Sequence, residues 1–149
     1  METLIFEQDD ARQEAALISI AQSVFDRFDG GYIQDRLAYI ADPMLIVAKE
    51  SDQWLGFKMA YRRGSALYSW LGGTHPDARR RGIAKLLMQT QHQIAVERGY
   101  KAVLTRTRAS NRSMIILNLK YGFDIVGFEV DSGGHPVATL RKSLKGDES

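Results

Sequence analysis

Apolar residues recur at helical spacing in the first part of the chain. Ala15, Leu17, Ile18, Ala21 and Val24 fall on one face of a helix that Asp9-Asp10 is placed to cap and Gly30-Gly31 to end. Residues 4–6 form a short apolar strand before this helix. The pattern predicts a second, shorter helix over residues 33–40, with Asp42-Pro43 as the turn that leaves it.

The pattern then changes to runs of β-branched, aromatic and other apolar residues, which are typical of strands. Strands are predicted over residues 44–49 and 54–62, joined by a polar hairpin loop at residues 50–53. A third strand is predicted over residues 66–71. The segment Gly72-Gly73-Thr74-His75-Pro76 is expected to end it in a loop.

Helix and strand signals alternate over the rest of the chain. A helix is predicted over residues 81–98, closed by Gly99, and a buried strand follows over residues 102–107. Ser110 or Asn111 is suited to cap a further helix that Gly122 ends. Two final strands are predicted as a hairpin, and their bounds are residues 123–130 and 136–144.

This order of elements predicts an α+β fold in a single domain, residues 1–149. The sheet is expected to be mostly antiparallel, with one parallel crossover that spans residues 66–107 and joins the strands at 66–71 and 102–107. Hydrophobic residues make up 44% of the sequence and charged residues 26%, the balance of a soluble globular protein. The sequence has no cysteine, which excludes disulfide scaffolds, cysteine nucleophiles and thiolate zinc sites.

The N-terminal residues are acidic and have no basic stretch followed by an apolar run, so we expect no secretion signal. No apolar run approaches the roughly 20 residues that span a bilayer, so we expect no membrane insertion. A cytoplasmic location is the resulting expectation.

Positive charge is concentrated in the middle of the chain. Residues 62–120 hold 12 lysine and arginine residues against two acidic ones. A solvated face is one interpretation. Because Arg79-Arg80-Arg81 directly precedes Gly82, a polyanionic partner, either a phosphate-bearing cofactor or a nucleic acid, is the other.

The arginine triplet stands where a strand and a short turn lead into a helix. The first N–H groups of a helix lack internal partners and the helix dipole adds positive charge there, so this end attracts anions. Gly82 and Ala84 leave room for phosphate oxygens, although Gly82 is also explained by close packing. The sequence has neither a Walker motif nor three spaced dinucleotide glycines, which disfavours NTP hydrolysis and nicotinamide chemistry.

The segment Arg79-Arg80-Arg81-Gly82-Ile83-Ala84 resembles the Arg/Gln-x-x-Gly-x-Gly/Ala signature of the GNAT superfamily of N-acetyltransferases. A second block, from Asn111 to Lys120-Tyr121-Gly122-Phe123, is similar to the family's segment on the following helix. The resemblance covers about residues 44–144. It implies a sheet of six to seven strands with about four helices, and a V-shaped splay between the fourth and fifth strands.

The resemblance also implies a site for acetyl-CoA as cosubstrate, without a metal. The backbone amides of Arg80, Arg81, Gly82, Ile83 and Ala84 would hold the pyrophosphate, with Arg79 beside them. Further along the cofactor, the backbone of Gly72, Gly73 and Thr74 would pair with pantetheine, and a Gly73 amide would face the thioester oxygen. Asn111 matches a cofactor-side asparagine, and it is equally well read as a helix cap.

The catalytic residues depart from the family pattern. The tyrosine that usually serves as general acid is replaced by Asn118, whose amide donates a hydrogen bond but no proton. Tyr121, one turn later, is an alternative acid or a packing residue. His75 is a candidate base or a loop residue, while His92 is expected on a helix surface and His135 in a hairpin. Their spacing does not indicate a metal site.

The first functional hypothesis is therefore transfer of an acetyl group from acetyl-CoA to a small-molecule or peptide amine. A non-catalytic acyl-CoA sensor or interaction module is the alternative, and an RNA-binding surface ranks last because aromatic residues are not interleaved with the arginines. Whether the chain forms a homodimer stays open. Four acidic residues hint at recognition of a cationic amine: Asp26, Asp29, Asp35 and Asp42.

Overall fold

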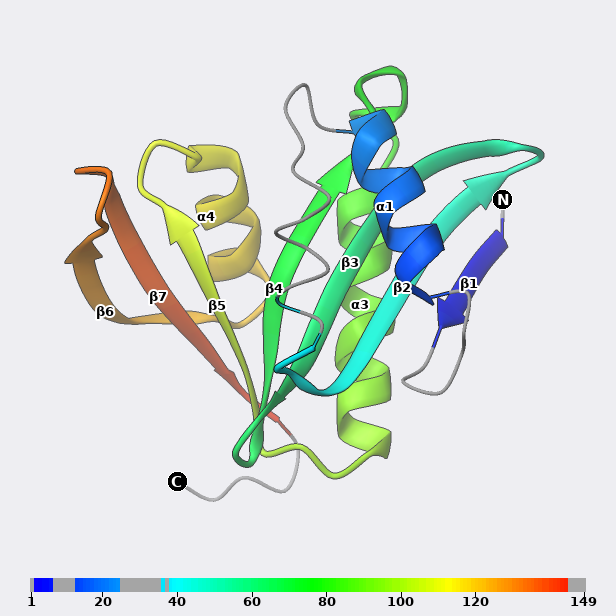
Figure 1. Cartoon of the computed structure of the whole chain (residues 1–149). Helices are drawn as coiled ribbons and strands as arrows, with labels where there is room; N and C mark the ends of the chain where they lie inside the picture. The colour runs from blue at the N-terminus through cyan, green and yellow to red at the C-terminus, as the bar shows by residue number, and fades with distance from the viewer. Residues whose placement is uncertain (1, 7–12, 25–35, 37, 145–149) are drawn as a thin grey trace.

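A seven-stranded sheet forms the centre of the computed structural model, which describes residues 2–6, 13–24, 36 and 38–144. The strand order is β1-β2-β3-β4-β5-β7-β6 (Figure 1). Neighbouring strands are antiparallel except for β4 and β5, which are parallel. The predicted α+β class and the single parallel crossover are confirmed.

The bounds of the elements follow the predicted order along the chain. The strands are β1 (Glu2–Phe6), β2 (Ala41–Glu50), β3 (Gln53–Arg63), β4 (Ala66–Thr74), β5 (Ala102–Arg108), β6 (Asp124–Val130) and β7 (Pro136–Ser143). The helices are α1 (Gln13–Val24), α3 (Ile83–Glu97) and α4 (Arg112–Lys120), and a 3-10 turn, η1 (Pro76–Ala78), precedes α3.

Three predictions about local structure need comment. The segment from Gly72 to Thr74 continues β4 and is not a loop, because its backbone pairs with β3. Asp42-Pro43 lies within β2, at an irregularity where Asp42 has a φ of 49°, so the predicted turn there is wrong. The helix predicted over residues 33–40 falls largely outside the described residues, of which 38 and 39 form a turn.

The two faces of the sheet carry separate apolar cores. Alternate residues of β2 point to opposite faces, so that Met44 and Ile46 pack towards α3 while Leu45 and Val47 pack towards α1. Figure 1 shows α1 and α3 on the two faces. Because each buried Leu, Ile or Phe side chain stabilises the fold by roughly 1.5–3 kcal/mol, the helices are held firmly against the sheet.

The parallel pair β4–β5 separates part-way along its length. Ladder pairs join the two strands only from Ala66 to Ser69 on β4 and from Ala102 to Thr105 on β5. Beyond Ser69, β4 continues to pair with β3, while β5 continues to pair with β7. The two strands diverge towards the end of the sheet where α4 lies (Figure 1). The predicted V-shaped splay between the fourth and fifth strands is confirmed.

Helix α3 packs tightly against the sheet at Gly56 of β3. A Cβ atom built there would lie 2.9 Å from the carbonyl oxygen of Gly73 and 2.9 Å from the Ile83 side chain. The missing side chain therefore lets the first turn of α3 pack directly beside the end of β4. The distance between the start of α3 and the end of β4 therefore depends on the absence of a side chain at Gly56.

We predict that Gly56→Ala lowers the free energy of unfolding by about 1–3 kcal/mol, because the added methyl group overpacks a contact with backbone. Gly127→Ala is the matched control. Its Cβ would meet Thr139 at an ordinary 3.6 Å, so we expect little change. Urea denaturation of both variants measures the difference, and equal stabilities would contradict the account of α3 packing.

Candidate active site

Two adjoining cavities follow the opening between β4 and β5. The inner cavity, of about 510 Å³, lies in the gap between the strands, and the outer cavity, of about 570 Å³, lies at the start of α3. Both are lined by the end of β4, where the chain has Gly72, Gly73 and Thr74, and by Asn111. The two cavities therefore form one groove along the splayed edge of β4.

The outer cavity has the features of an anion site. Its lining includes Arg79, Arg80, Gly82, Ala84 and Lys85, so three cationic side chains surround the first turn of α3. Gly82 is the N-cap residue, with a φ of 76°, and no side chain caps the helix. Backbone N–H groups and the positive end of the helix dipole are consequently available to phosphate oxygens.

Arg81 does not join the other two arginines in the groove. Its guanidinium lies 2.8 Å from a carboxylate oxygen of Glu50, in an ion pair on the surface. Its side chain is not among those that line either cavity. The triplet therefore divides, with Arg79 and Arg80 facing the groove and Arg81 fixing the turn to β2. The sequence pattern did not distinguish these roles.

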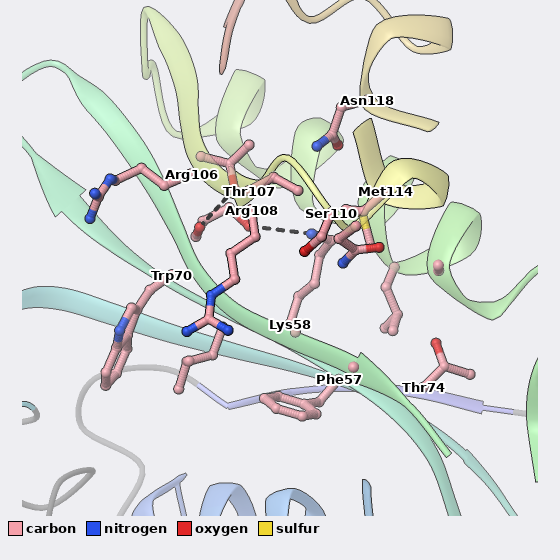
Figure 2. A pocket seen from close by; sticks show the side chains of 18 residues that line it. Phe57, Lys58, Trp70, Thr74, Arg106, Thr107, Arg108, Ser110, Met114 and Asn118 are labelled. Atoms are coloured by element: carbon pink, nitrogen blue, oxygen red, sulfur yellow. Dashed lines mark hydrogen bonds between the residues drawn. The ribbon is translucent and has the colours of Figure 1, made fainter. Parts of the chain in front are cut away.

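The inner cavity contains a lysine that the sequence analysis missed. Lys58 extends from β3 into the gap, where its Nζ donates a hydrogen bond of 3.3 Å to the hydroxyl of Ser69 on β4 (Figure 2). Thr105 of β5 closes the same end of the gap and donates its own hydroxyl to the Ser69 carbonyl. The one signal in the sequence was a lysine flanked by apolar residues in a strand.

Lys58 is an unusual cation, because its side chain is half-buried and its ammonium is largely desolvated. Desolvation lowers its pKa from 10.5 to about 8. The other charged residues that line the inner cavity are Arg106 and Arg108, and no Asp or Glu is among the described residues that line it. The cavity is therefore positively charged.

Asn111 and Asn118 both lie in the groove. Asn111 occupies the N-cap position of α4, yet its side chain makes no capping hydrogen bond, and it lines both cavities. Asn118 is buried on α4 and lines the inner cavity (Figure 2). Tyr121 lies at the end of α4, packs against the core and lines neither cavity.

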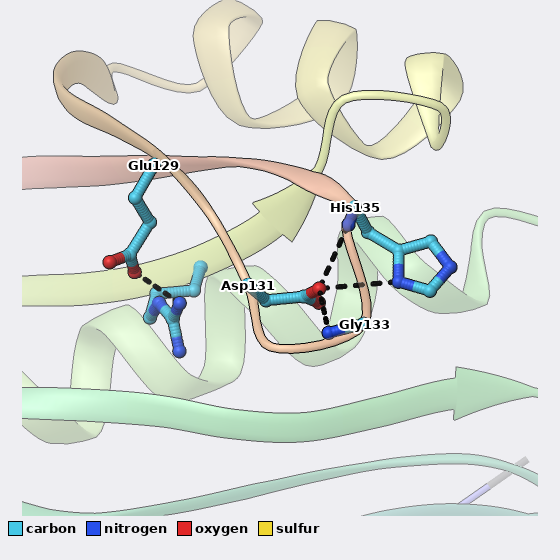
Figure 3. Close-up of polar contacts among 5 residues, drawn as sticks. Glu129, Asp131, Gly133 and His135 are labelled. Atoms are coloured by element: carbon cyan, nitrogen blue, oxygen red, sulfur yellow. Dashed lines mark hydrogen bonds and ion pairs between the residues drawn. The ribbon is translucent and has the colours of Figure 1, made fainter.

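The histidines lie outside the groove. His92 is buried on α3, which corrects the expectation of a surface residue, and Lys142 lies 3.3 Å from its Nδ1. Desolvation, with Lys142 and Lys58 nearby, lowers the pKa of His92 to about 3. His75 closes the end of β4, where its Nδ1 accepts a hydrogen bond from the backbone N–H of Asp77. His135 lies in the β6–β7 hairpin turn, where its backbone N–H donates to Asp131 (Figure 3).

A third recess, of about 320 Å³, lies next to the inner cavity and shares Thr105 and Arg106 with it. Its lining includes Tyr61 and Tyr68, whose rings stack 5.3 Å apart, and Glu129, which forms an ion pair with Arg106 (Figure 3). The recess and the inner cavity therefore adjoin at Thr105 and Arg106.

Of the four acidic residues proposed to recognise an amine, the structure describes Asp42, and it lines none of these cavities. Asp42 forms an ion pair of 2.6 Å with Arg62, and Asp26, Asp29 and Asp35 lie outside the described residues. Within the described part of the chain, no cluster of three or more metal-ligating side chains occurs. No helix in that part has the length and apolar character required to cross a membrane.

A family model described as "Acetyltransferase (GNAT) family" matches residues 11–123. The chain belongs to the GNAT family. It is therefore an acetyltransferase enzyme whose fold binds acetyl-CoA, and the groove at β4 and α3 coincides with the two blocks that carry the resemblance in the sequence. No curated protein matches the chain.

Solved structures support this assignment of the fold. The ribosomal-protein-S18-alanine N-acetyltransferase from Escherichia coli is 15% identical with a TM-score of 0.77, and the match covers 99% of both chains. Ard1 from Thermoplasma volcanium is 19% identical with a TM-score of 0.75, covering 97% of this chain and 99% of that one. A putative streptothricin acetyltransferase from Bacillus anthracis str. Ames, in complex with acetyl coenzyme A, is 18% identical with a TM-score of 0.64. That match covers 69% of this acetyltransferase and 63% of the other chain.

The buried His92 predicts a loss of stability in acid. Its pKa of about 3 in the folded protein lies below the 6.5 of an exposed histidine, so the unfolded chain binds the extra proton first as pH falls. The contribution of neutral His92 to the free energy of unfolding is complete above pH 6.5. Below that pH it decreases by about 1.4 kcal/mol per pH unit. We expect the wild type to lose about 2 kcal/mol more than His92→Gln between pH 7 and pH 5 in urea denaturation. Equal losses would refute this origin.

The half-buried Lys58 predicts a variant that is more stable than the wild type. A pKa of about 8, against 10.5 unfolded, means that burial of the ammonium costs about 1–3 kcal/mol at pH 7 once partial solvent access through the cavity is allowed for. We expect Lys58→Met to recover this energy at pH 7 and to lose the advantage as pH rises from 8 towards 10.5. Lys101→Met, at an exposed position, serves as the control in thermal unfolding. Destabilisation by Lys58→Met at pH 7 would show that the charge is compensated.

Proposed function

We propose that this acetyltransferase moves an acetyl group from acetyl-CoA to the amino group of a small molecule or a peptide. The observation that carries the proposal is the continuous groove from the first turn of α3 to the gap between β4 and β5. One end of the groove fits a diphosphate and the other exposes strand backbone. Acetyl-CoA has a diphosphate and a pantetheine chain with two amides in the same order.

The diphosphate is assigned to the outer cavity. The backbone N–H groups of Arg80 to Ala84 would donate hydrogen bonds to the phosphates, which also lie at the positive end of the α3 dipole. The side chains of Arg79 and Arg80 add charge-assisted hydrogen bonds. Lys85 contributes further positive charge from the same turn. Arg81 contributes its backbone alone, since its side chain pairs with Glu50.

The pantetheine amides are assigned to Gly72, Gly73 and Thr74, where β4 has no ladder pairs to β5. The backbone N–H of His75 donates to Leu55 of β3, so by the alternation of an antiparallel ladder the N–H of Gly73 also points to β3, while those of Gly72 and Thr74 point to the gap. One of these two N–H groups, and not that of Gly73 as predicted from the sequence, would stabilise the negative charge that develops on the thioester oxygen, and such a donor contributes about 10²–10³ in rate. The register between β3 and β4 shifts just before this stretch, where Met59 pairs with Leu71 and Ala60 with Ser69, so that Trp70 has no partner in the ladder. Asn111 lies against the cofactor beside this stretch.

The reaction proceeds by direct attack in this proposal. The nitrogen of a neutral amine forms a bond to the thioester carbon, the carbon–sulfur bond breaks, and the sulfur leaves as thiolate. The amide of Asn118 donates a hydrogen bond to the sulfur, and the excess proton of the amine passes to water. Holding the amine and thioester in attack geometry supplies several kcal/mol. The acceptor enters through the recess beside Tyr61 and Tyr68.

The non-catalytic acyl-CoA sensor considered from the sequence is not favoured, because the chain belongs to a family of acetyltransferases, although Asn118 stands where the resemblance places a tyrosine. Release of free thiol from acetyl-CoA, measured with a panel of small amines and N-terminal peptides, separates the two. Thermal stabilisation by CoA with no turnover on any acceptor would favour the sensor. The absence of cysteine is compatible with the cytoplasmic location that we propose for either activity.

We predict that Arg79→Glu weakens CoA binding by at least about tenfold, since it replaces a charge-assisted phosphate contact with repulsion. Arg98→Glu is the matched control, because Arg98 is an exposed residue just beyond the opposite end of α3. Isothermal titration with CoA gives both affinities. An unchanged affinity in Arg79→Glu would move the diphosphate away from the outer cavity.

A further inference from the structure

We propose that the inner cavity binds a carboxylate at the far end of the donor's acyl group, so that a short dicarboxylic acyl-CoA such as succinyl-CoA is preferred over a neutral acyl-CoA of equal length. The proposal rests on the proposed function and adds to its donors: beside acetyl-CoA, the same groove would accept an acyl-CoA that ends in a carboxylate. It begins from the position of Lys58, a charged side chain in the gap between β4 and β5.

The Lys58 side chain extends from Gly72, where the pantetheine chain is assigned, to Ser69, where β4 and β5 begin to pair. Its Cα is the ladder partner of Gly72, and its Nζ lies 3.9 Å from where a Cβ of Gly72 would be. The same Nζ lies 3.3 Å from the hydroxyl of Ser69, the last β4 residue paired with β5 (Figure 2). An acyl chain that starts beside Gly73 and extends into the gap therefore meets the ammonium within a few atoms.

The charge of Lys58 has no counter-ion in the described part of the protein. None of the ion pairs found there includes Lys58, and the described residues that line the cavity include no acid. The neighbouring charged groups do not compensate it. Arg106 and Lys142 are cations, and the burial of His92 keeps that side chain neutral. Arg106 already has Glu129 as its partner.

The hydrogen-bonding groups around the gap suit an anion. The Lys58 ammonium supplies N–H donors and lines the cavity, whereas the amide of Asn118 is already assigned to the thioester sulfur. With a pKa of about 8, Lys58 is still mainly protonated at neutral pH. A methyl group in this place leaves the desolvated ammonium with a single hydroxyl partner, whereas a carboxylate satisfies it with a charge-assisted bond.

The orientation of Lys58 indicates the acyl group and not the acceptor as the source of this carboxylate. Phe57 and Met59 belong to the core on the α1 face, so Lys58 between them points to the α3 face. The outer cavity, which includes the first turn of α3, lies on that face as well. The carboxylate therefore comes from the molecule whose phosphates bind at α3.

Isothermal titration with succinyl-CoA and butyryl-CoA tests the proposal without knowledge of the acceptor. The two ligands have acyl chains of four carbons and differ in the terminal carboxylate. We expect the wild type to bind succinyl-CoA at least about tenfold more tightly, the effect of one charge-assisted hydrogen bond. Equal affinities, or tighter binding of butyryl-CoA, would overturn the proposal.

The variant Lys58→Met assigns the preference to this side chain. We expect the ratio of the two affinities to fall to about one or to reverse in Lys58→Met, with CoA itself bound as in the wild type. In Lys101→Met, which removes an exposed lysine just before the start of β5, the ratio should stay at the wild-type value. A ratio unchanged in Lys58→Met would overturn the assignment. Thermal unfolding confirms that both variants are folded.

The outcomes separate this proposal from the proposed function. Binding of CoA without discrimination between the two acyl groups rejects the carboxylate site and leaves the function standing. Failure of CoA, acetyl-CoA and succinyl-CoA to bind at all rejects the function. Turnover of acetyl-CoA that requires a carboxylate on the acceptor, and loses this requirement in Lys58→Met, assigns the lysine to the acceptor and overturns the proposal.

Discussion

The separation of two parallel strands is the constraint on which the rest of the structure depends. After Ser69 and Thr105, β4 and β5 no longer share hydrogen bonds, because β4 follows β3 and β5 follows β7. Backbone N–H and C=O groups removed from water require partners. An edge of this kind inside a sheet is therefore suited to a ligand that has amide groups of its own, as the pantetheine chain does.

The position of α3 adds the second half of the site. The crossover between β4 and β5 contains α3, so the helix must begin close to where β4 ends. Gly56 allows its first turn to pack against β3 and to lie beside Gly73. As a result, a helix N-terminus without a capping side chain adjoins the open strand edge, and one extended ligand can use both. The close packing of α3 on the sheet and the continuity of the groove both depend on Gly56.

Much of this arrangement could be predicted from the sequence because its signals are local. The turn from Arg79 to Ala84 combines charge, small residues and a helix start within six positions. The end of β4 could not be predicted, because glycines such as Gly72 and Gly73 are typical of loops. Pairing with β3 holds them in the strand. Likewise, nothing local distinguishes Arg81, which is drawn away by Glu50, a residue distant in the sequence.

The buried polar residues illustrate the other limit of sequence reasoning. Met88, His92 and Ala95 are spaced as one helix face, so the burial of His92 had a periodic signal that the polarity of histidine outweighed. Lys58 has the alternate position between two core residues of β3, which is normally solvated. It is instead half-buried in a cavity that residues of α3 and α4 also line, a tertiary effect. Such residues are costly to the fold, which makes them good candidates for function.

The most direct test of the central claim is an amide NMR titration of the protein with CoA. The account predicts chemical-shift changes concentrated at Gly72 to Thr74, at Arg79 to Ala84 and at Asn111, with one common dissociation constant, because a single ligand occupies the whole groove. Changes confined to one of these segments, or located at another surface of the sheet, would contradict it.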